Sequence, residues 1–149
     1  MSGIPKLAVY DHQHVVSLDP GLISKLEAAA AAAMPMVLER CKQPESPLSR
    51  LEEVEVSLID DATIADVHQR FMDIPGATDV ITFDHGEIHI SVETAQRHSA
   101  EYFQEFEAEV MLYILHGLLH LAGHEDATDE GHATMDMHQT ELLSQVWQG

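Results

Sequence analysis

Two histidines and an aspartate near the C-terminus have types and spacing that suit a metal ion. His116 and His120 are four residues apart, so in a helix their imidazoles lie on one face and can close on one ion. Gly123 is a residue at which a helix can end and the chain turn back, so that Asp126 could supply a third ligand. Three protein ligands leave a fourth position for water, which is the arrangement of a catalytic zinc site. The chemistry indicated is hydrolysis by a metal-activated water.

The third ligand has two candidates in the sequence. Register favours Asp126, which follows the expected chain reversal at Gly123 by three residues. His124 is the alternative, because imidazole is the commoner zinc ligand. We predict one bound Zn²⁺ ion, and a carboxylate ligand makes another divalent metal, such as manganese or iron, an alternative. The competing interpretation of His116 and His120, a pair of satisfied core histidines, is disfavoured by the glycine and the acidic residue that follow them.

Gly117 separates this pattern from that of the zinc peptidases. In those enzymes the residue after the first histidine of the pair is the glutamate that serves as general base. Glycine has no side chain, so a peptidase mechanism would need its base from elsewhere in this chain. The glycine also lets backbone or substrate approach the helix closely. We therefore expect a metal-dependent hydrolase other than a peptidase of this kind.

Length and composition indicate one ordinary globular domain. The chain has 149 residues and a mass of 16.5 kDa, which predicts a single domain over residues 1–149 with a sizeable core. No apolar run approaches the length of a membrane span, and the N-terminus does not have the pattern of a signal peptide. Cys41 is the only cysteine, so an intrachain disulfide is excluded. We predict a cytoplasmic protein with no membrane partner and no disulfide partner.

The charge balance is strongly acidic. The chain has 7 Lys and Arg against 26 Asp and Glu, a formal net charge of −19 with neutral histidine. Such a chain repels polyanions at long range. This argues against tight, non-specific binding of nucleic acid, because binding of that kind depends on cationic contacts to phosphates.

Apolar periodicity and turn residues predict an α+β domain. We expect a small mixed β-sheet of about four strands packed with about five helices, with the metal site at the end of a central buried helix. The predicted strands are residues 7–10, 54–59, 80–83 and 87–91. The predicted helices are residues 22–41, one from the Asp60-Asp61 cap to 72, one that begins near 92, and residues 103–121 and 129–146, with 43–47 as a loop.

Three motifs together resemble those of a known family. Residues 116–126 (H-G-L-L-H-L-A-G-H-E-D) resemble the signature H-G-x-L-H-L-x-G-Y-D-H of the YbeY family of metal-dependent endoribonucleases. Residues 78–83 (T-D-V-I-T-F) resemble the family's T-D-V-L-S-F, and residues 86–91 (G-E-I-H-I-S) resemble its G-D-I-x-I-S. The resemblance covers about Val54 to Leu143 and keeps the motifs in the family's order. It implies a function in rRNA maturation, with rRNA and ribosomal components as partners.

The chain departs from the family pattern at two places. The family's third metal ligand is a histidine where this chain has Asp126. The family also has a functional arginine ahead of the T-D-V motif, and alignment of the aromatic residues puts Met72 in its place. Arg70, two residues earlier, is our candidate for a catalytic cation, because a phosphodiester transition state is stabilised by nearby positive charge. We expect Asp79 and Thr78 either to orient a ligand histidine or to form an Asx turn.

Three functions fit these features. The first is a single-strand-specific, metal-dependent endoribonuclease that hydrolyses phosphodiester bonds in rRNA with a metal-activated water. The second is a metal-dependent hydrolase of a small or uncharged substrate, which suits the net charge and the displaced arginine. The third is a non-catalytic ribosome-assembly factor with a retained metal site, whose acidic surface docks on basic ribosomal proteins.

Overall fold

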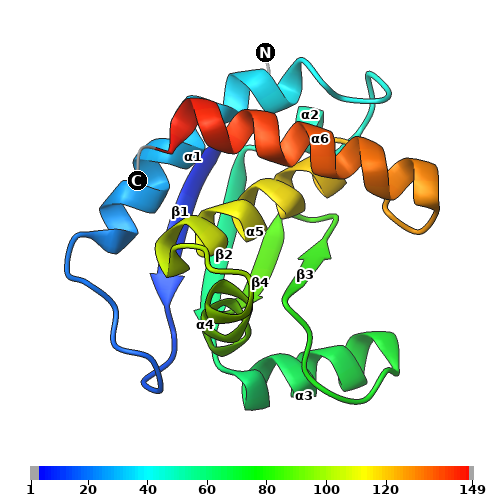
Figure 1. Cartoon of the computed structure of the whole chain (residues 1–149). Coiled ribbons are helices and arrows are strands. Elements are labelled where there is room, and N and C mark those ends of the chain that lie inside the picture. The colour runs from blue at the N-terminus through cyan, green and yellow to red at the C-terminus, as the bar shows by residue number, and fades with distance from the viewer. Residues whose placement is uncertain (1–3, 148–149) are drawn as a thin grey trace.

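One mixed sheet of four strands forms the centre of the structure, a computed structural model that describes residues 4–147. The strands are β1 (Lys6–Asp11), β2 (Glu53–Ile59), β3 (Val80–Phe83) and β4 (Glu87–Ser91). Their order across the sheet is β1-β2-β4-β3, in which β1, β2 and β4 are parallel and β3 runs antiparallel to β4 (Figure 1). Within the described chain, β3 is therefore an edge strand with one side free of strand pairing.

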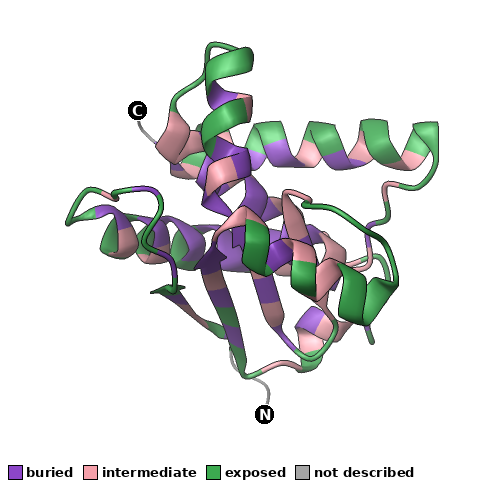
Figure 2. Ribbon diagram, turned by 90° about the horizontal axis from the view of Figure 1, so that it is seen from below, coloured by how far each residue is buried: buried purple, intermediate pink, exposed green. Residues whose placement is uncertain are grey.

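The described part of the chain has six helices. They are α1 (Leu22–Leu38), α2 (Pro47–Arg50), α3 (Asp61–Met72), α4 (Val92–Glu101), α5 (Phe106–Leu121) and α6 (Asp129–Val146). α5 lies against β3 and β4, and α1, α4 and α6 pack around it (Figure 1). Because α5 is covered on several sides, its apolar residues are not confined to one stripe. Figure 2 shows that buried residues concentrate in the sheet and in the middle of the molecule.

The second half of α5 approaches the sheet closely at Gly117. A Cβ atom at this position would lie 2.8 Å from Cδ1 of Ile88 on β4, which is closer than real Cβ atoms come to another atom. The absence of a side chain lets the helix pack directly on the strand. Gly117 occupies the position of the general base in zinc peptidases. Here it is required for the packing of α5 on β4. That packing fixes the position of His116 and His120 relative to the sheet.

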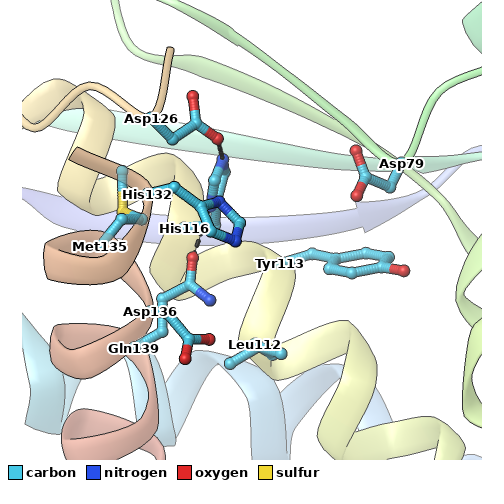
Figure 3. Close-up of a pocket in the computed structure, with 9 residues that line it drawn as sticks. All are labelled: Asp79, Leu112, Tyr113, His116, Asp126, His132, Met135, Asp136 and Gln139. Atoms are coloured by element: carbon cyan, nitrogen blue, oxygen red, sulfur yellow. Dashed lines mark hydrogen bonds and ion pairs between the residues drawn. The ribbon is translucent and has the colours of Figure 1, made fainter. Parts of the chain in front are cut away.

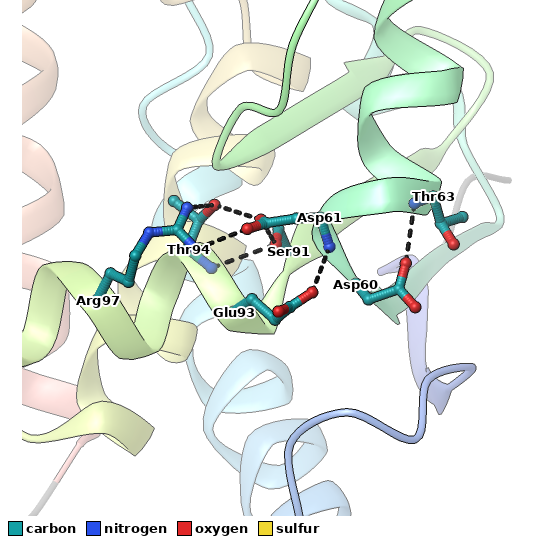
Figure 4. A network of polar contacts seen from close by, with 7 residues as sticks. All are labelled: Asp60, Asp61, Thr63, Ser91, Glu93, Thr94 and Arg97. Carbon is teal, nitrogen blue, oxygen red and sulfur yellow. Dashed lines mark hydrogen bonds and ion pairs between the residues drawn. The ribbon is translucent and has the colours of Figure 1, made fainter.

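A polar network around Asp61 ties the start of α3 to α4 and to the end of β4 (Figure 4). Oδ1 of Asp61 accepts hydrogen bonds from the hydroxyls of Ser91, at 2.6 Å, and Thr94, at 2.7 Å. Oδ2 of Asp61 accepts a hydrogen bond from Nη1 of Arg97 at 2.6 Å. One carboxylate therefore joins three neighbouring segments at this end of the sheet.

The fold class and the four strands predicted from the sequence are confirmed. The structure has one helix more than the five predicted, because α2, a single turn that begins at Pro47 in the predicted loop, was not expected. The helix predicted over 103–121 begins only at Phe106, since Phe103 has a left-handed φ of 55°. The helix predicted to run to residue 41 ends at Leu38. None of the helices among residues 4–147 is long and apolar enough to cross a membrane.

Candidate metal centre

A chain reversal follows the C-terminal end of α5. The helix ends at Leu121, and Gly123 has a left-handed φ of 98°. The N–H of Gly123 donates to the carbonyl of His120, and the N–H of His124 donates to the carbonyl of Leu119. This closes the helix in the manner of a Schellman motif. The reversal expected at Gly123 is therefore present, and it carries the following residues back beside the last turn of α5.

The reversed segment brings Asp126 to both histidines. Oδ2 of Asp126 lies 3.5 Å from Nε2 of His116, and Oδ1 lies 3.6 Å from Nε2 of His120. These separations are longer than hydrogen bonds, but they approach the distance of about 3.3 Å between two ligands of a tetrahedral ion with bonds near 2.0–2.2 Å. Among the described residues, this is the one group of three or more His, Cys, Asp or Glu side chains whose ligand atoms all lie within 4.8 Å of one another. Two imidazoles and one carboxylate fit a divalent ion such as zinc.

Gln139 of α6 sets the orientation of His116 (Figure 3). Its side-chain oxygen accepts a hydrogen bond from Nδ1 of His116, and the residue is only 9% exposed. A proton on Nδ1 leaves the lone pair of Nε2 free, and Nε2 is the atom that faces Asp126. Metal-binding histidines commonly have such a partner. Sequence analysis did not identify Gln139 as a site residue, because its contact depends on how α6 packs on α5.

The surroundings of His120 favour the form of the imidazole that binds metals. Burial lowers the pKa of His120, and the imidazole of His116 lowers it further, whereas Asp126 and Glu125 act in the opposite direction. The neutral imidazole is the ligand form. The two rings are 4.7 Å apart between centroids, and each side chain is 24% exposed. The site thus combines a histidine of lowered pKa with access from solvent.

His124, the alternative third ligand, faces away from the histidine pair. It is 7% exposed, and its Nε2 lies 2.7 Å from the carbonyl oxygen of Arg40. Its ring also packs on that of His138, with centroids 4.9 Å apart. A hydrogen bond from Nε2–H to this carbonyl fastens the reversed segment to the end of α1. The structure brings Asp126 to the pair and gives His124 a structural contact instead.

The candidate ligands lie between two pockets. The first has a volume of about 250 Å³ and is lined by His116 and Asp126, together with Asp79 and Tyr113; we call it the His116 pocket (Figure 3). The second has a volume of about 270 Å³ and includes three residues of β3; we call it the β3-edge pocket. The β3-edge pocket is lined by Met72, Val80, Ile81, Thr82, Asp84, His120 and Glu125. A bound ion would therefore be open to an extended substrate on two sides.

Asp79 and Thr78 make local hydrogen bonds, and Asp79 lines the His116 pocket. Oδ1 of Asp79 accepts hydrogen bonds from the backbone N–H of Val80, at 2.8 Å, and from the hydroxyl of Thr78, at 3.3 Å. The carboxylate of Asp79 faces the pocket across from His116 (Figure 3). Among the described residues, neither side chain bonds to a ligand histidine. The bond from the N–H of the next residue does not close an Asx turn, which uses the N–H two residues on, so neither predicted role has its hydrogen bond in the described part of the chain.

Arg70, the candidate catalytic cation, lies outside both pockets. Its Nη1 pairs with Oδ2 of Asp66 at 3.2 Å, and its side chain is 67% exposed. Met72, which the sequence resemblance aligns with the family's arginine, lines the β3-edge pocket. In the described residues no lysine or arginine lines either pocket. The structure does not bring Arg70 to the candidate ligands, so positive charge at the site would come from the metal.

Comparisons with known proteins agree in pointing to one family. The family model described as "Endoribonuclease YbeY" matches residues 23–147. An "Endoribonuclease YbeY" of Prochlorococcus marinus is 33% identical over 112 residues, which cover 65% of this chain and 60% of the relative. That of Nautilia profundicola is 35% identical over 88 residues, with 54% and 63% covered. The matches thus span about three fifths of the length of these relatives.

A solved structure shows the same fold. The solution structure of TM1509 from Thermotoga maritima superimposes with a TM-score of 0.62, at 23% sequence identity, and covers 95% of this chain and 89% of that chain. At this identity the likeness concerns the fold alone. The arrangement of sheet and helices that positions the candidate ligands is therefore one that occurs in a known structure.

Proposed function

Because this chain belongs to the YbeY family, we propose that it is a metal-dependent endoribonuclease that cleaves single-stranded rRNA during ribosome maturation in the cytoplasm. The observation that carries the proposal is the carboxylate of Asp126 between Nε2 of His116 and Nε2 of His120. Two nitrogens and one oxygen leave a position for water, as in a catalytic zinc site. Zinc is the ion we expect, and manganese or iron is the alternative for a site with a carboxylate ligand.

Each residue of the site has its own role in holding or orienting the metal. When bound, the ion supplies a water of lowered pKa and a positive charge for the phosphate. His116 and His120 present Nε2, and Gln139 keeps the proton of His116 on Nδ1. Asp126 adds a negative charge, so we expect the bound water to be less acidic than in a three-histidine site. The pockets on either side fit a strand that passes across the ion.

A metal-dependent hydrolase of a small or uncharged substrate is the second candidate function. Two observations favour it: the net charge of −19, and the absence of lysine and arginine from both pockets as far as the chain is described. A phosphodiester backbone would meet Asp79 in one pocket and Asp84 and Glu125 in the other. These carboxylates repel phosphate. A neutral substrate would meet no such repulsion.

Cleavage of labelled RNA by the metal-loaded protein tests the proposal. We expect cleavage of a single strand, no cleavage of the same sequence in a duplex, and loss of both cleavage and bound metal in His116→Ala. His14→Ala is the matched control, because His14 is exposed between β1 and α1, and it should keep both properties. Intact RNA beside hydrolysis of a small neutral ester would favour the second candidate. Metal content that His116→Ala leaves unchanged would contradict the metal site.

A further inference from the structure

Aromatic side chains gather at the surface beside the β3-edge pocket; we call them the aromatic rim (Phe71, Phe83 and His85). The ring of Phe71, on the last turn of α3, meets Phe83 edge-on, with centroids 5.5 Å apart and planes at 77°. His85, in the turn after β3, stacks on Phe83 at 5.6 Å and 20°. Phe71 is 65% exposed, and the side chain of His85 is 66% exposed. Phe71 and His85 are thus largely open to solvent, and both contact Phe83.

The aromatic rim adjoins the β3-edge pocket, which is lined by the candidate metal ligand His120. Met72 follows Phe71 in the chain, and Asp84 follows Phe83. Met72 and Asp84 line the β3-edge pocket together with His120. β3 lies between α3 and α5 in Figure 1, and it packs against α5. Phe83 packs with Ile81 and Ile64 on the face of the sheet toward α3, so a ligand held on the rim would cross the free edge of β3 to reach His120.

Packing does not explain the exposure of these apolar side chains. Phe71, Met72 and Ile74 are 65%, 44% and 47% exposed, and they follow one another closely at the end of α3. A group of large apolar side chains that stays at the surface is typical of an interaction site. The nearby pocket with His120 indicates that the interaction serves the same site.

We propose that the aromatic rim is a base-stacking site that holds an unpaired nucleotide next to the phosphodiester to be cleaved. This inference rests on the proposed function, because it assigns how that substrate is bound. Single-stranded RNA is recognised largely by stacking of its bases on aromatic side chains and on arginine guanidinium groups. Both are present here, since Cζ of Arg70 lies 5.9 Å from the centre of the Phe71 ring of the rim. Arg70 is thereby assigned to substrate binding and not to the reacting centre.

Base stacking also accounts for how an acidic protein can hold RNA. Neither pocket has a lysine or arginine among its described residues, so the pockets themselves offer a phosphate no cationic side chain. The faces of the bases are uncharged, and their stacking is not opposed by the carboxylates nearby. Affinity of this origin depends only weakly on salt. It also selects single strands, because bases inside a duplex do not expose their faces.

Replacements of Phe71 in the metal-loaded full chain test the base-stacking site. Phe71→Leu keeps apolar bulk and removes the aromatic face, whereas Phe71→Trp keeps an aromatic face. Phe103→Leu is the matched control, because Phe103 is 98% exposed between α4 and α5. Initial rates on a short single-stranded RNA give KM and kcat. We expect Phe71→Leu to raise KM about 5- to 150-fold, the range for one stacked base, with kcat within about twofold. Phe71→Trp and Phe103→Leu should keep the KM of the wild type.

The fluorescence of Phe71→Trp gives a second measurement. RNA should quench the introduced tryptophan, and an abasic strand of the same length should not. If RNA does not quench it and Phe71→Leu has the KM of Phe103→Leu, the base-stacking site is wrong while RNA cleavage, and with it the proposed function, stands. Wild-type protein that cleaves no RNA contradicts both. A KM unchanged in Phe71→Leu, beside a changed sedimentation mass of the free protein, would make the rim an interface between two copies of the chain and overturn the inference.

Discussion

The side-chain oxygen of Gln139 on α6 accepts a hydrogen bond from Nδ1 of His116 on α5. This contact makes α6 part of the candidate metal centre, although all three candidate ligands precede that helix. Nε2 of His116 can face Asp126 as a ligand only while the proton stays on Nδ1. The last helix therefore contributes to metal binding through the tautomer of a histidine that it does not contain.

Gln139→Ala should weaken metal binding about 10- to 100-fold, because His116 loses the acceptor that fixes its tautomer. Gln139→Glu keeps an acceptor oxygen and should keep most of the affinity. Competition with a chromogenic chelator measures the change. Gln145→Ala is the control, since Gln145 is exposed on the same helix. Equal affinities in Gln139→Ala and Gln145→Ala would show that His116 does not depend on this contact.

Asp126→Ala and His124→Ala should separate metal binding from stability. Asp126→Ala removes the carboxylate between the two Nε2 atoms, so bound metal should be lost on gel filtration. His124→Ala should keep its metal but lower the free energy of unfolding by about 1–3 kcal/mol, because the carbonyl of Arg40 loses its donor and the buried ring of His124 is removed. Elemental analysis and urea unfolding measure the two effects. Loss of metal in His124→Ala with retention in Asp126→Ala would reverse the assignment of the third ligand.

Gly117→Ala should destabilise the protein, because the added methyl group would overlap Ile88. Overpacking of this kind costs about 1–3 kcal/mol. Ile88→Ala removes the atoms in the way, so the same glycine replacement should cost less in that background. Urea unfolding of the two single variants and the double variant gives the coupling between the positions. Additive effects would mean that Gly117 is not constrained by β4.

Acid should weaken the network at Asp61 (Figure 4). Burial opposes ionisation of this carboxyl group, but hydrogen bonds from Arg97, Ser91 and Thr94 outweigh it and hold the pKa of Asp61 below its usual value of 3.8. A folded-state pKa that is lowered stabilises the protein above the unfolded pKa, and this stabilisation is lost as the pH falls through the folded value. Asp61→Asn should therefore lower the free energy of unfolding by about 1–3 kcal/mol at pH 7. The difference from wild type should shrink below about pH 4.

Urea unfolding of wild type and Asp61→Asn between neutral and acidic pH measures this difference. Asp66→Asn is the control, because Asp66 is 61% exposed and pairs with Arg70 on the surface of α3. Its effect should stay below about 1 kcal/mol at every pH, as for other exposed ion pairs. A destabilisation by Asp61→Asn that is the same at pH 3 and pH 7 would contradict a role for the charge.

The strands could be predicted from sequence because their signals are local. The alternation of Glu87–Ser91 gave β4 with its observed bounds, since a half-buried strand needs only a period of two. The single turn Pro47–Arg50 was missed, because four residues are too few to show a helical period. The start of α5 was placed too early because the left-handed backbone of Phe103 has no signature in its residue type.

The candidate site likewise has one part that follows from local sequence and one part that depends on packing. The convergence of His116 and His120 follows from helical spacing, and the return of the chain follows from Gly123. Register favoured Asp126 over His124, but the contacts that separate the two depend on which side of the returning segment faces α5. The role of Gln139 could not be predicted, because its contact joins α6 to α5 and no local sequence pattern relates these two helices.

The metal group is assembled within one short stretch of chain, from His116 to Asp126, whereas the walls that would guide a substrate come from remote segments such as Asp79 and Met72. The amount of bound metal and the catalytic rate thus depend on different parts of the molecule. A variant damaged in the sheet edge or in α3 can remain fully loaded and yet be inactive. Metal stoichiometry is therefore a measure of local integrity at the end of α5 and at its contact with α6, and it cannot replace an assay of activity.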